Sequence, residues 1–140
     1  KISTPSIYKK GIQLEEKGYI SSNIVKEGKM PEKAIYSLTE AGENQLGNLM
    51  FEISAKPIQI FLDFNAVIVN LDALLPENQM KCLTDIEANI KTLKSYLEEN
   101  LKAKENVPEI PQTGLSVLHQ QFVLAQSIET WIEELKLKYE

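Results

Sequence analysis

Residues 14–42 read LEEKGYISSNIVKEGKMPEKAIYSLTEAG and contain two extended segments around a polar turn. The first segment begins at Tyr19 and runs to Val25, and the second covers residues 34–38, where the side chains alternate as in a strand. Between them, residues 26–31 combine lysines with glycine and proline, which favour a turn. The stretch therefore predicts a β-hairpin with a basic tip.

Helical patterns flank this hairpin on both sides. Upstream, Ser3-Thr4-Pro5-Ser6 supplies a capping hydroxyl and an N1 proline, and Lys17-Gly18 supplies a basic last turn and a helix stop, so we expect a helix over about residues 5 to 17. Downstream, Thr39 is a suitable N-cap for a helix that Pro57 ends. The apolar face of that helix consists of Leu46, Leu49, Met50 and Ile53. Helix, hairpin, helix is the order of a winged helix from its recognition helix onward.

Residues 58–75 form the most apolar stretch of the chain, but five polar residues interrupt it. We therefore expect a buried helix from about Phe61 to Leu74 rather than a membrane span. Pro76 then opens a third helix, which precedes a loop at residues 106–114 and a last helix from Leu115 to about Tyr139.

The third and last helices each carry an apolar stripe. In the third helix, the stripe recurs at steps of 3, 4, 3 and 4 and consists of Leu83, Ile86, Ile90, Leu93 and Leu97. In the last helix it consists of Leu118, Phe122, Ala125, Ile128, Ile132 and Leu135. Two such helices joined by a short loop should be antiparallel. The spacing alone allows this coiled-coil-like seam to form within one chain or between subunits.

Charge is distributed unevenly along the chain. The 15 lysines and 20 acids give a net charge of -5, yet residues 1–40 hold seven lysines and five acids, a net +2, and residues 41–140 carry the remaining net -7. An anionic partner should therefore meet the N-terminal part. The chain has no arginine, so lysine is its only strong cation and the usual bidentate reader of guanine is missing.

Composition also restricts the chemistry and the compartment. Apolar residues make up 43% of the chain, which can supply a core and excludes a disordered tail. Cys82 is the single cysteine, so an intrachain disulfide is impossible and a reducing cytoplasm is the simpler expectation. Cys82 and His119 lack the clustered ligands of a zinc site and the partners of a catalytic triad. We therefore expect no enzyme, no metal and no cofactor.

Three consecutive segments resemble signatures of the PadR family of bacterial transcriptional regulators: Ser3 to Tyr8, Leu14 to Ile20, and Tyr36 to Gly42. The residues from Phe64 to Pro76, and the helices up to Trp131-Ile132, resemble the C-terminal domain of the longer PadR proteins, the virulence-activator type. The resemblance implies a mainly α fold. A winged helix-turn-helix, starting at the recognition helix, would occupy residues 1–56, and a helical, coiled-coil-like dimerisation domain would occupy residues 57–140.

The resemblance also implies a function. PadR proteins form homodimers that bind a two-fold symmetric operator in double-stranded DNA, usually to repress, and some release DNA when a small-molecule effector binds. The residues expected to contact DNA are Ser3, Thr4, Ser6, Tyr8, Lys9, Lys10, Lys26, Lys29 and Lys33. Those expected at the dimer interface are Leu83, Ile86, Ile90, Leu93, Leu97, Leu118, Phe122, Ile128, Trp131, Ile132 and Leu135.

Other interpretations stay open for these residues. The lysines could form an ordinary solvated face, and the Tyr8 ring could pack locally instead of placing its hydroxyl on a phosphate. Trp131 could line an effector pocket between subunits, although tryptophan on an amphipathic helix is more often a packing residue. The alternative function is a dimeric helical protein-interaction module without DNA binding.

The sequence departs from the family pattern in two ways. Gly11 stands where the family usually has leucine, which costs about 1 kcal/mol of helix propensity relative to alanine. Ile12 could rotate inward to compensate, or the helix could be softened. A winged helix also has two helices before its recognition helix, so we expect the chain as given to be N-terminally incomplete. Ile7, Leu14 and Ile20 would then be partly uncovered, the wing poorly ordered and DNA binding weak.

Overall fold

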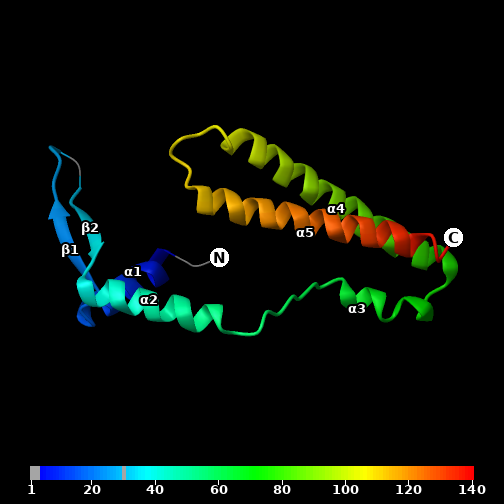
Figure 1. The fold of residues 1–140 in the computed structure, drawn as a ribbon, viewed down its shortest axis with the longest axis horizontal. Helices are drawn as coiled ribbons and strands as arrows, with labels where there is room; N and C mark the ends of the chain where they lie inside the picture. The colour runs from blue at the N-terminus through cyan, green and yellow to red at the C-terminus, as the bar shows by residue number, and fades with distance from the viewer. Residues whose placement is uncertain (1–3, 30) are drawn as a thin grey trace. The chain divides into compact units, whose positions relative to one another are not determined.

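A helix, a β-hairpin and a second helix make up the first part of the chain, as residues 14–42 predict. In the computed structural model, which describes residues 4–29 and 31–140, α1 spans Thr4–Glu16, β1 Ile20–Val25, β2 Lys33–Leu38 and α2 Glu40–Ser54 (Figure 1). The strands pair antiparallel, with Ile20 opposite Leu38 and Val25 opposite Lys33. These elements belong to a first unit at residues 1–60, and a second unit covers residues 61–140.

Gly18 ends α1 and turns the chain into β1. Its φ of 73° lies in the left-handed region, which glycine adopts without steric cost. The Gly18 N–H donates to the Glu15 carbonyl at 2.9 Å, and the Tyr19 N–H donates to the Leu14 carbonyl at 3.0 Å. This pair of hydrogen bonds is a Schellman cap, so the predicted helix stop at Gly18 is confirmed.

Thr39 connects this turn to the start of α2. Its hydroxyl donates to the Gly18 carbonyl at 2.6 Å and accepts from the Gly42 N–H at 3.1 Å, which confirms the predicted N-cap. The Thr39 N–H donates to the Tyr19 carbonyl at 3.1 Å. Gly42 is buried there, and an added Cβ would lie 1.9 Å from the Tyr19 oxygen. We call this contact the Gly18–Thr39–Gly42 junction.

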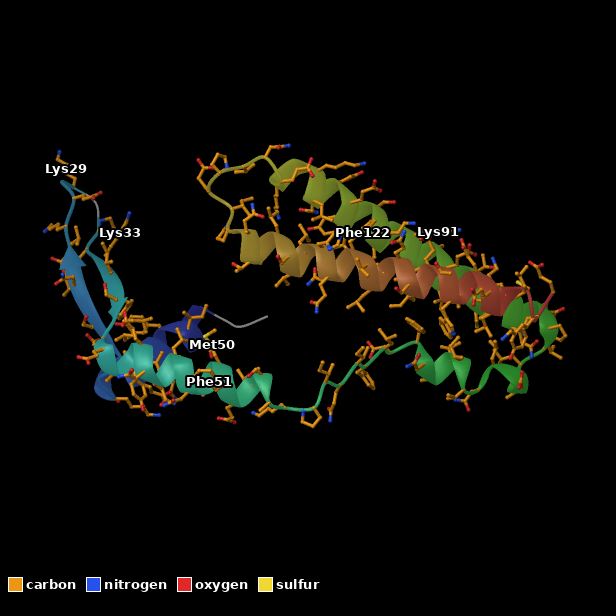
Figure 2. The ribbon with its side chains drawn as sticks, viewed as in Figure 1. Lys29, Lys33, Met50, Phe51, Lys91 and Phe122 are labelled. Atoms are coloured by element: carbon orange, nitrogen blue, oxygen red, sulfur yellow. The ribbon has the colours of Figure 1, made fainter. Side chains whose placement is uncertain are left out.

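Apolar side chains of the first unit are largely exposed. Among its described residues Gly42 alone is buried, whereas Ile7 and Leu14 are 60% and 41% exposed and Ile20 is half-buried. On α2, Met50 and Phe51 are also exposed (Figure 2). The unit therefore holds its shape mainly through backbone hydrogen bonds and caps rather than through an enclosed core.

Gly11 lies inside α1 and faces the ring of Tyr36. An added Cβ would meet Tyr36 Cζ and Oη at 3.7 Å, which is ordinary van der Waals contact. Ile12 remains 40% exposed, so it has not turned into an enclosed position. The helix continues through Gly11 to Glu16.

In the second unit, the prediction of a helix from Phe61 to Leu74 is wrong. The chain forms only the four-residue α3, Asn65–Ile68, and a 3-10 turn, η1, Leu71–Ala73. The side-chain amide of Asn70 donates at 2.8 Å to the Ala66 carbonyl, the acceptor that its own N–H would use in a continuing α-helix. The Asn70 N–H instead reaches the Val67 carbonyl. Leu71 alone becomes buried, while Phe61 stays 86% exposed.

Two long helices, α4 at Pro76–Lys104 and α5 at Gln112–Lys136, complete the second unit. Pro76 is at the start of α4, as predicted. The loop is shorter than expected, because α5 begins after Pro111 and includes Gly114, and α5 ends at Lys136 rather than near Tyr139.

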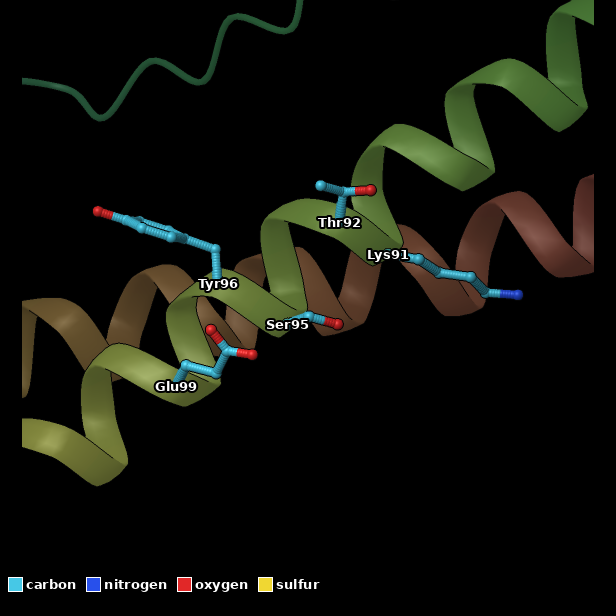
Figure 3. Close-up of a pocket in the computed structure, with 5 residues that line it drawn as sticks. All are labelled: Lys91, Thr92, Ser95, Tyr96 and Glu99. Atoms are coloured by element: carbon cyan, nitrogen blue, oxygen red, sulfur yellow. The ribbon is translucent and has the colours of Figure 1, made fainter.

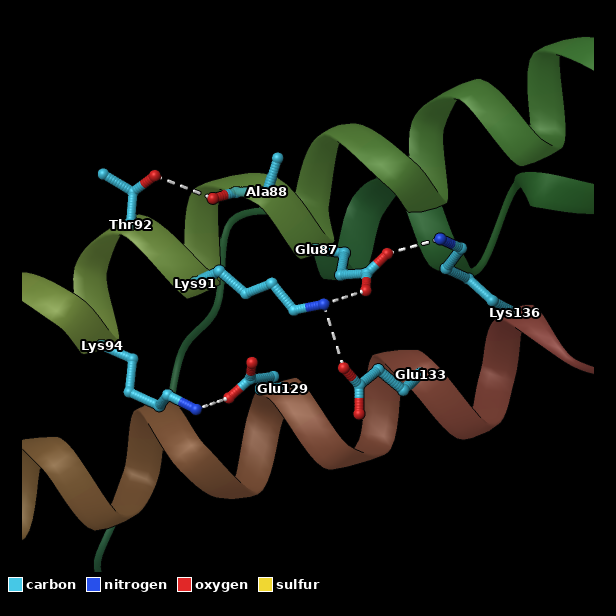
Figure 4. A network of polar contacts seen from close by, with 8 residues as sticks. All are labelled: Glu87, Ala88, Lys91, Thr92, Lys94, Glu129, Glu133 and Lys136. Carbon is cyan, nitrogen blue, oxygen red and sulfur yellow. Dashed lines mark hydrogen bonds and ion pairs between the residues drawn. The ribbon is translucent and has the colours of Figure 1, made fainter.

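Helices α4 and α5 lie side by side and antiparallel, as predicted (Figure 1). Their buried contacts join the two apolar stripes and include Leu83, Ile90, Leu97, Ala125 and Ile132, and Leu71 of η1 completes this core. Ion pairs also join α4 to α5 in the antiparallel arrangement. Glu87 pairs with Lys136, Lys91 with Glu133 at 3.1 Å, and Lys94 with Glu129 (Figure 4). The buried part of the seam thus lies within one chain.

We expect Gly42→Ala to destabilise the first unit by about 1–3 kcal/mol, because its methyl group would overlap the Tyr19 carbonyl. Gly11→Ala is the matched control. It should stabilise α1 by about 1 kcal/mol, because the added methyl meets Tyr36 at contact distance. Amide hydrogen exchange of β1 and β2 measures both effects. Equal protection in the two variants would contradict the geometry of the Gly18–Thr39–Gly42 junction.

The ion pairs between α4 and α5 predict that the stability of the second unit depends on pH. Hydrogen bonds from Lys136 and then Lys91 lower the pKa of the Glu87 carboxyl. A lowered folded-state pKa stabilises the fold above the ordinary carboxyl pKa, and this contribution is lost as pH falls through the folded value. Glu87→Gln should therefore lower the free energy of unfolding at neutral pH by up to about 1 kcal/mol, with the difference vanishing in acid.

Glu98→Gln is the control for this test. Glu98 also has a lowered pKa, but its partner Lys102, at 2.8 Å, lies on the same helix. Denaturation followed by the fluorescence of Trp131 reports the second unit, and Glu98→Gln should have the smaller effect. A Glu87→Gln deficit that persists at roughly pH 3 would show that the charge is not its cause.

Candidate nucleic-acid interface

The first half of α1 presents polar and basic side chains to solvent. Ser6, Tyr8, Lys9 and Lys10 are all exposed, with Tyr8 at 66%. Ser3 and the side chain of Thr4 lie outside the described residues. Four of the six residues expected on the recognition helix are therefore accessible on one helical segment.

The wing contributes a second basic group. Lys26 and Lys29 lie in the turn after β1, where Gly28 has a φ of 57°, and Lys33 is the first residue of β2 (Figure 2). All three lysines are exposed. Gly28 lets the backbone take a left-handed bend in the loop that joins the strands, and Lys26 and Lys29 lie in that loop.

The lysines of the two units differ in their pairing. Within residues 4–29 and 31–140, no carboxylate lies within ion-pairing distance of Lys9, Lys10, Lys26, Lys29 or Lys33. In the second unit, by contrast, five lysines pair with acids: Lys81, Lys91, Lys94, Lys102 and Lys136. In the first unit Lys56 pairs with Glu52 at 2.9 Å, but the five lysines expected to contact DNA have no such partner in the described ranges, so their charge can attract an anion.

Among the described residues, Lys17 is a further unpaired lysine of the first unit, one that was not expected among the DNA-contacting residues. Lys17 follows α1, is exposed and likewise has no ion-pair partner within the described part of the chain. Lys17 and Ser6 lie near opposite ends of α1, so they would contact different parts of a bound ligand. The sequence pattern predicts Lys17 only as the basic last turn of a helix, whereas α1 ends at Glu16.

The residues expected at a dimer interface differ in how deeply they are buried. Leu83, Ile90, Leu97 and Ile132 are buried between α4 and α5. Ile86, Leu118, Phe122, Ile128 and Leu135 pack against that core and are partly buried. Leu93 and Trp131 are 46% and 38% exposed. Only these last two of the expected set present a large part of their surface outside the chain.

Chemistry-bearing residues do not gather elsewhere in the described residues. No group of three or more His, Cys, Asp or Glu side chains there could hold a metal ion. Cys82 is half-buried and His119 is exposed, on different helices. Nor does any helix in the same residues have the length and apolar character needed to cross a membrane.

The order of α1, the two-stranded wing and α2 is that of a winged helix from its recognition helix onward, and α4 with α5 forms a helical hairpin. Neither a protein-family model nor a curated relative matches the sequence. Solved structures do match in fold. Bacillus subtilis PadR, crystallised in complex with operator DNA, has a TM-score of 0.83 over 97% of this chain and 79% of that chain, at 20% identity.

Two further structures have the same fold. The PadR-like transcriptional regulator BC1756 from Bacillus cereus has a TM-score of 0.65 over 96% of this chain and 74% of its own, at 18% identity. The Vibrio cholerae virulence activator AphA has a TM-score of 0.62 over 99% of this chain and 78% of its own, at 17% identity. The chain therefore has the fold of the PadR-like regulators, and the predicted fold class, mainly helical with a winged helix, is confirmed.

Proposed function

We propose that the protein is a sequence-specific DNA-binding transcriptional regulator, a repressor, that binds a palindromic operator as a homodimer. The observation that supports this most directly is the exposed and unpaired state of the lysines on α1 and on the wing, among the described residues. In the second unit, by comparison, five of the seven lysines pair with carboxylates. The fold shared with a PadR crystallised on operator DNA agrees with the proposal.

In this proposal α1 enters the major groove. A helix fits the major groove of B-DNA, and the first turns of a recognition helix reach the base edges. Ser3, Thr4 and Ser6 would bond to bases or phosphates, and Lys9 and Lys10 would neutralise phosphates or donate to guanine O6 or N7. Tyr8 would place its hydroxyl on a phosphate.

The wing would add contacts that position the protein without reading sequence. Lys26, Lys29 and Lys33 are three charges on one hairpin, and each phosphate contact releases counterions and increases the salt dependence of binding. Because the chain has no arginine, specificity would depend on hydroxyl contacts and on DNA shape more than on bidentate guanine recognition.

We expect the double variant Lys9→Ala/Lys10→Ala of the full-length protein to lose operator affinity and to flatten the salt dependence, by about one unit of slope for each phosphate contact removed. The control is Lys81→Ala/Lys102→Ala, which removes the same charge from ion-paired positions on α4. Fluorescence anisotropy at several salt concentrations measures both. An unchanged affinity in the Lys9/Lys10 variant would refute the assignment of α1 as the recognition helix.

A homodimer would give the protein the two-fold symmetry of a palindromic operator. The two sides of the α4–α5 hairpin differ in character. Glu87, Lys91 and Lys94 recur at steps of 4 and 3 on one side of α4, where they pair with α5 (Figure 4). On α5, Val117, Leu124 and Trp131 recur every seven residues and are exposed.

We propose that the second subunit covers this apolar side of α5. Covering the ion-pair side would strip water from charges that are now partly hydrated, which costs more than burial of apolar side chains returns. Leu93 of the expected interface is also exposed, and Trp131 belongs to the apolar side itself. The buried members of the expected interface would act indirectly, by holding α4 and α5 together.

Leu124→Glu should convert the dimer into a folded monomer, because it places a charge in the apolar contact. Val123→Glu is its matched control. The two side chains are exposed to 44% and 43% and are adjacent in sequence, so they lie about 100° apart around α5. Sedimentation velocity at micromolar concentration gives the mass. A monomeric wild-type protein would end the dimer proposal.

The experiment that tests the function as a whole is selection of bound sequences from a random duplex library by the full-length protein at physiological salt. Enrichment of an inverted repeat is expected. Its absence, with the protein folded and dimeric, would leave the helical interaction module as the function. The proposal also includes a small-molecule effector that changes operator affinity, and a cytoplasmic location, where DNA is available and Cys82 stays reduced.

A further inference from the structure

A small cavity lies in the second unit where the segment before α3 crosses the α4–α5 hairpin. Its volume is about 280 Å³. Leu62 and Phe64 come from the crossing segment, and the rest of the wall comes from the two long helices. The lining residues are Leu62, Phe64, Ile86, Asn89, Ile90, Leu93 and Ile128. Three separate parts of the second unit therefore line it, and it stays open to solvent where Asn89 and Leu93 are exposed.

The aromatic wall of the cavity is held in place by stacking. The ring of Phe64 lies 6.1 Å from that of Trp131, centroid to centroid, with 26° between the planes. This distance is within the range of attractive aromatic pairs. Trp131 is the single tryptophan of the chain, so its fluorescence reports on a residue in contact with the wall.

The lining is suited to an uncharged ligand. Six of its seven side chains are apolar, and no charged side chain is among them in the described residues. Asn89 is the exception, and its amide can both donate and accept a hydrogen bond. An ion would lose its hydration there without gaining a counter-charge, whereas a neutral molecule with one polar group would keep a partner for it.

A second cavity, on α4, has neither walls from several segments nor an apolar lining. It has a volume of about 460 Å³ and is lined by Lys91, Thr92, Ser95, Tyr96 and Glu99 (Figure 3). All five belong to a single helix, so no second element closes over a ligand. The hollow beside Phe64 is smaller but has walls from several segments and an apolar lining, which are the features of small-molecule sites.

We propose that the cavity beside Phe64 binds a small, uncharged, mostly apolar molecule with one hydrogen-bonding group, which Asn89 receives. Its volume is slightly below the roughly 300 Å³ at which ligand sites usually begin, so the ligand is small, with no more than two or three aromatic rings or a similar bulk. That this ligand is the effector rests on the proposed regulatory function. Binding itself does not depend on DNA.

The test uses N-phenyl-1-naphthylamine, an uncharged fluorescent molecule with two aromatic groups and one N–H, and the full-length protein without DNA. We expect saturable enhancement of the probe's emission, with energy transfer from Trp131. Leu93→Trp should fill the mouth of the cavity, and Asn89→Ala should remove the hydrogen bond. Leu93→Trp should raise the dissociation constant about tenfold or more, measured with the probe excited directly.

Matched controls separate the cavity from other apolar surface. Val123→Trp makes a comparable change at a side chain of similar exposure, 43% against 46% for Leu93, and Asn78→Ala removes an amide from α4 outside the cavity. Both controls should bind the probe like the wild type. Sedimentation of every variant verifies that its subunit composition is unchanged.

Saturable binding that both cavity variants weaken and both controls retain would support the proposal. Probe binding that is non-saturable, or that Leu93→Trp and Asn89→Ala leave unchanged, would overturn it. Operator binding, measured separately, tests the regulatory function, so a failure of the cavity proposal leaves the DNA-binding result intact and the reverse also holds.

Discussion

The arrangement of the first unit depends on the two hydrogen bonds of the Thr39 hydroxyl. It joins the turn after α1 to the first turn of α2, because it donates to the Gly18 carbonyl and accepts from the Gly42 N–H. Gly42 has no Cβ, which lets the α2 backbone approach the Tyr19 carbonyl. The side chains of this unit are almost all exposed, so polar contacts set the angle between α1 and the wing. The Ser22 N–H, at 3.1 Å, and the Ser22 hydroxyl both donate to the Glu15 carboxylate and join α1 directly to β1. The positions of the α1 and wing lysines relative to one another follow from these contacts together with those of Thr39.

This explains which elements were predictable. The ends of α1, β1, β2 and α2 are set by Gly18, by the Gly28 turn and by the Thr39 cap, and each acts within a few residues of itself. Local turn and cap chemistry can be interpreted from a single sequence. The helix predicted from Phe61 to Leu74 failed because it was inferred from apolar content alone. The Asn70 side chain, by taking the Ala66 carbonyl, offered the backbone a competing hydrogen bond that hydrophobicity does not encode.

The candidate sites were predictable to different extents. Residue type and charge distribution predicted where the basic surface lies, but not that its lysines would be unpaired among the described residues. On α4 the same residue type pairs with acids: Lys81 with Asp85 four residues away, a spacing visible in the sequence, and Lys94 with Glu129 across the hairpin, which depends on the packing register. The cavity beside Phe64 was not predictable, because Leu62 and Phe64 reach it only when their segment is not helical.

The apolar side of the α4–α5 hairpin connects the cavity to the proposed subunit contact. Phe64 contacts Trp131 on the apolar side of α5, the side on which we place the second subunit. A ligand in the cavity would press on Phe64, and through the stacked rings on a residue of the subunit contact. The change would be transmitted through packing rather than through the ion pairs, because Glu87, Lys91 and Lys94 lie on the other side of α4. An effector can shift an equilibrium only by its differential affinity for two arrangements, and a wall shared with the subunit contact is a place where such a difference can arise.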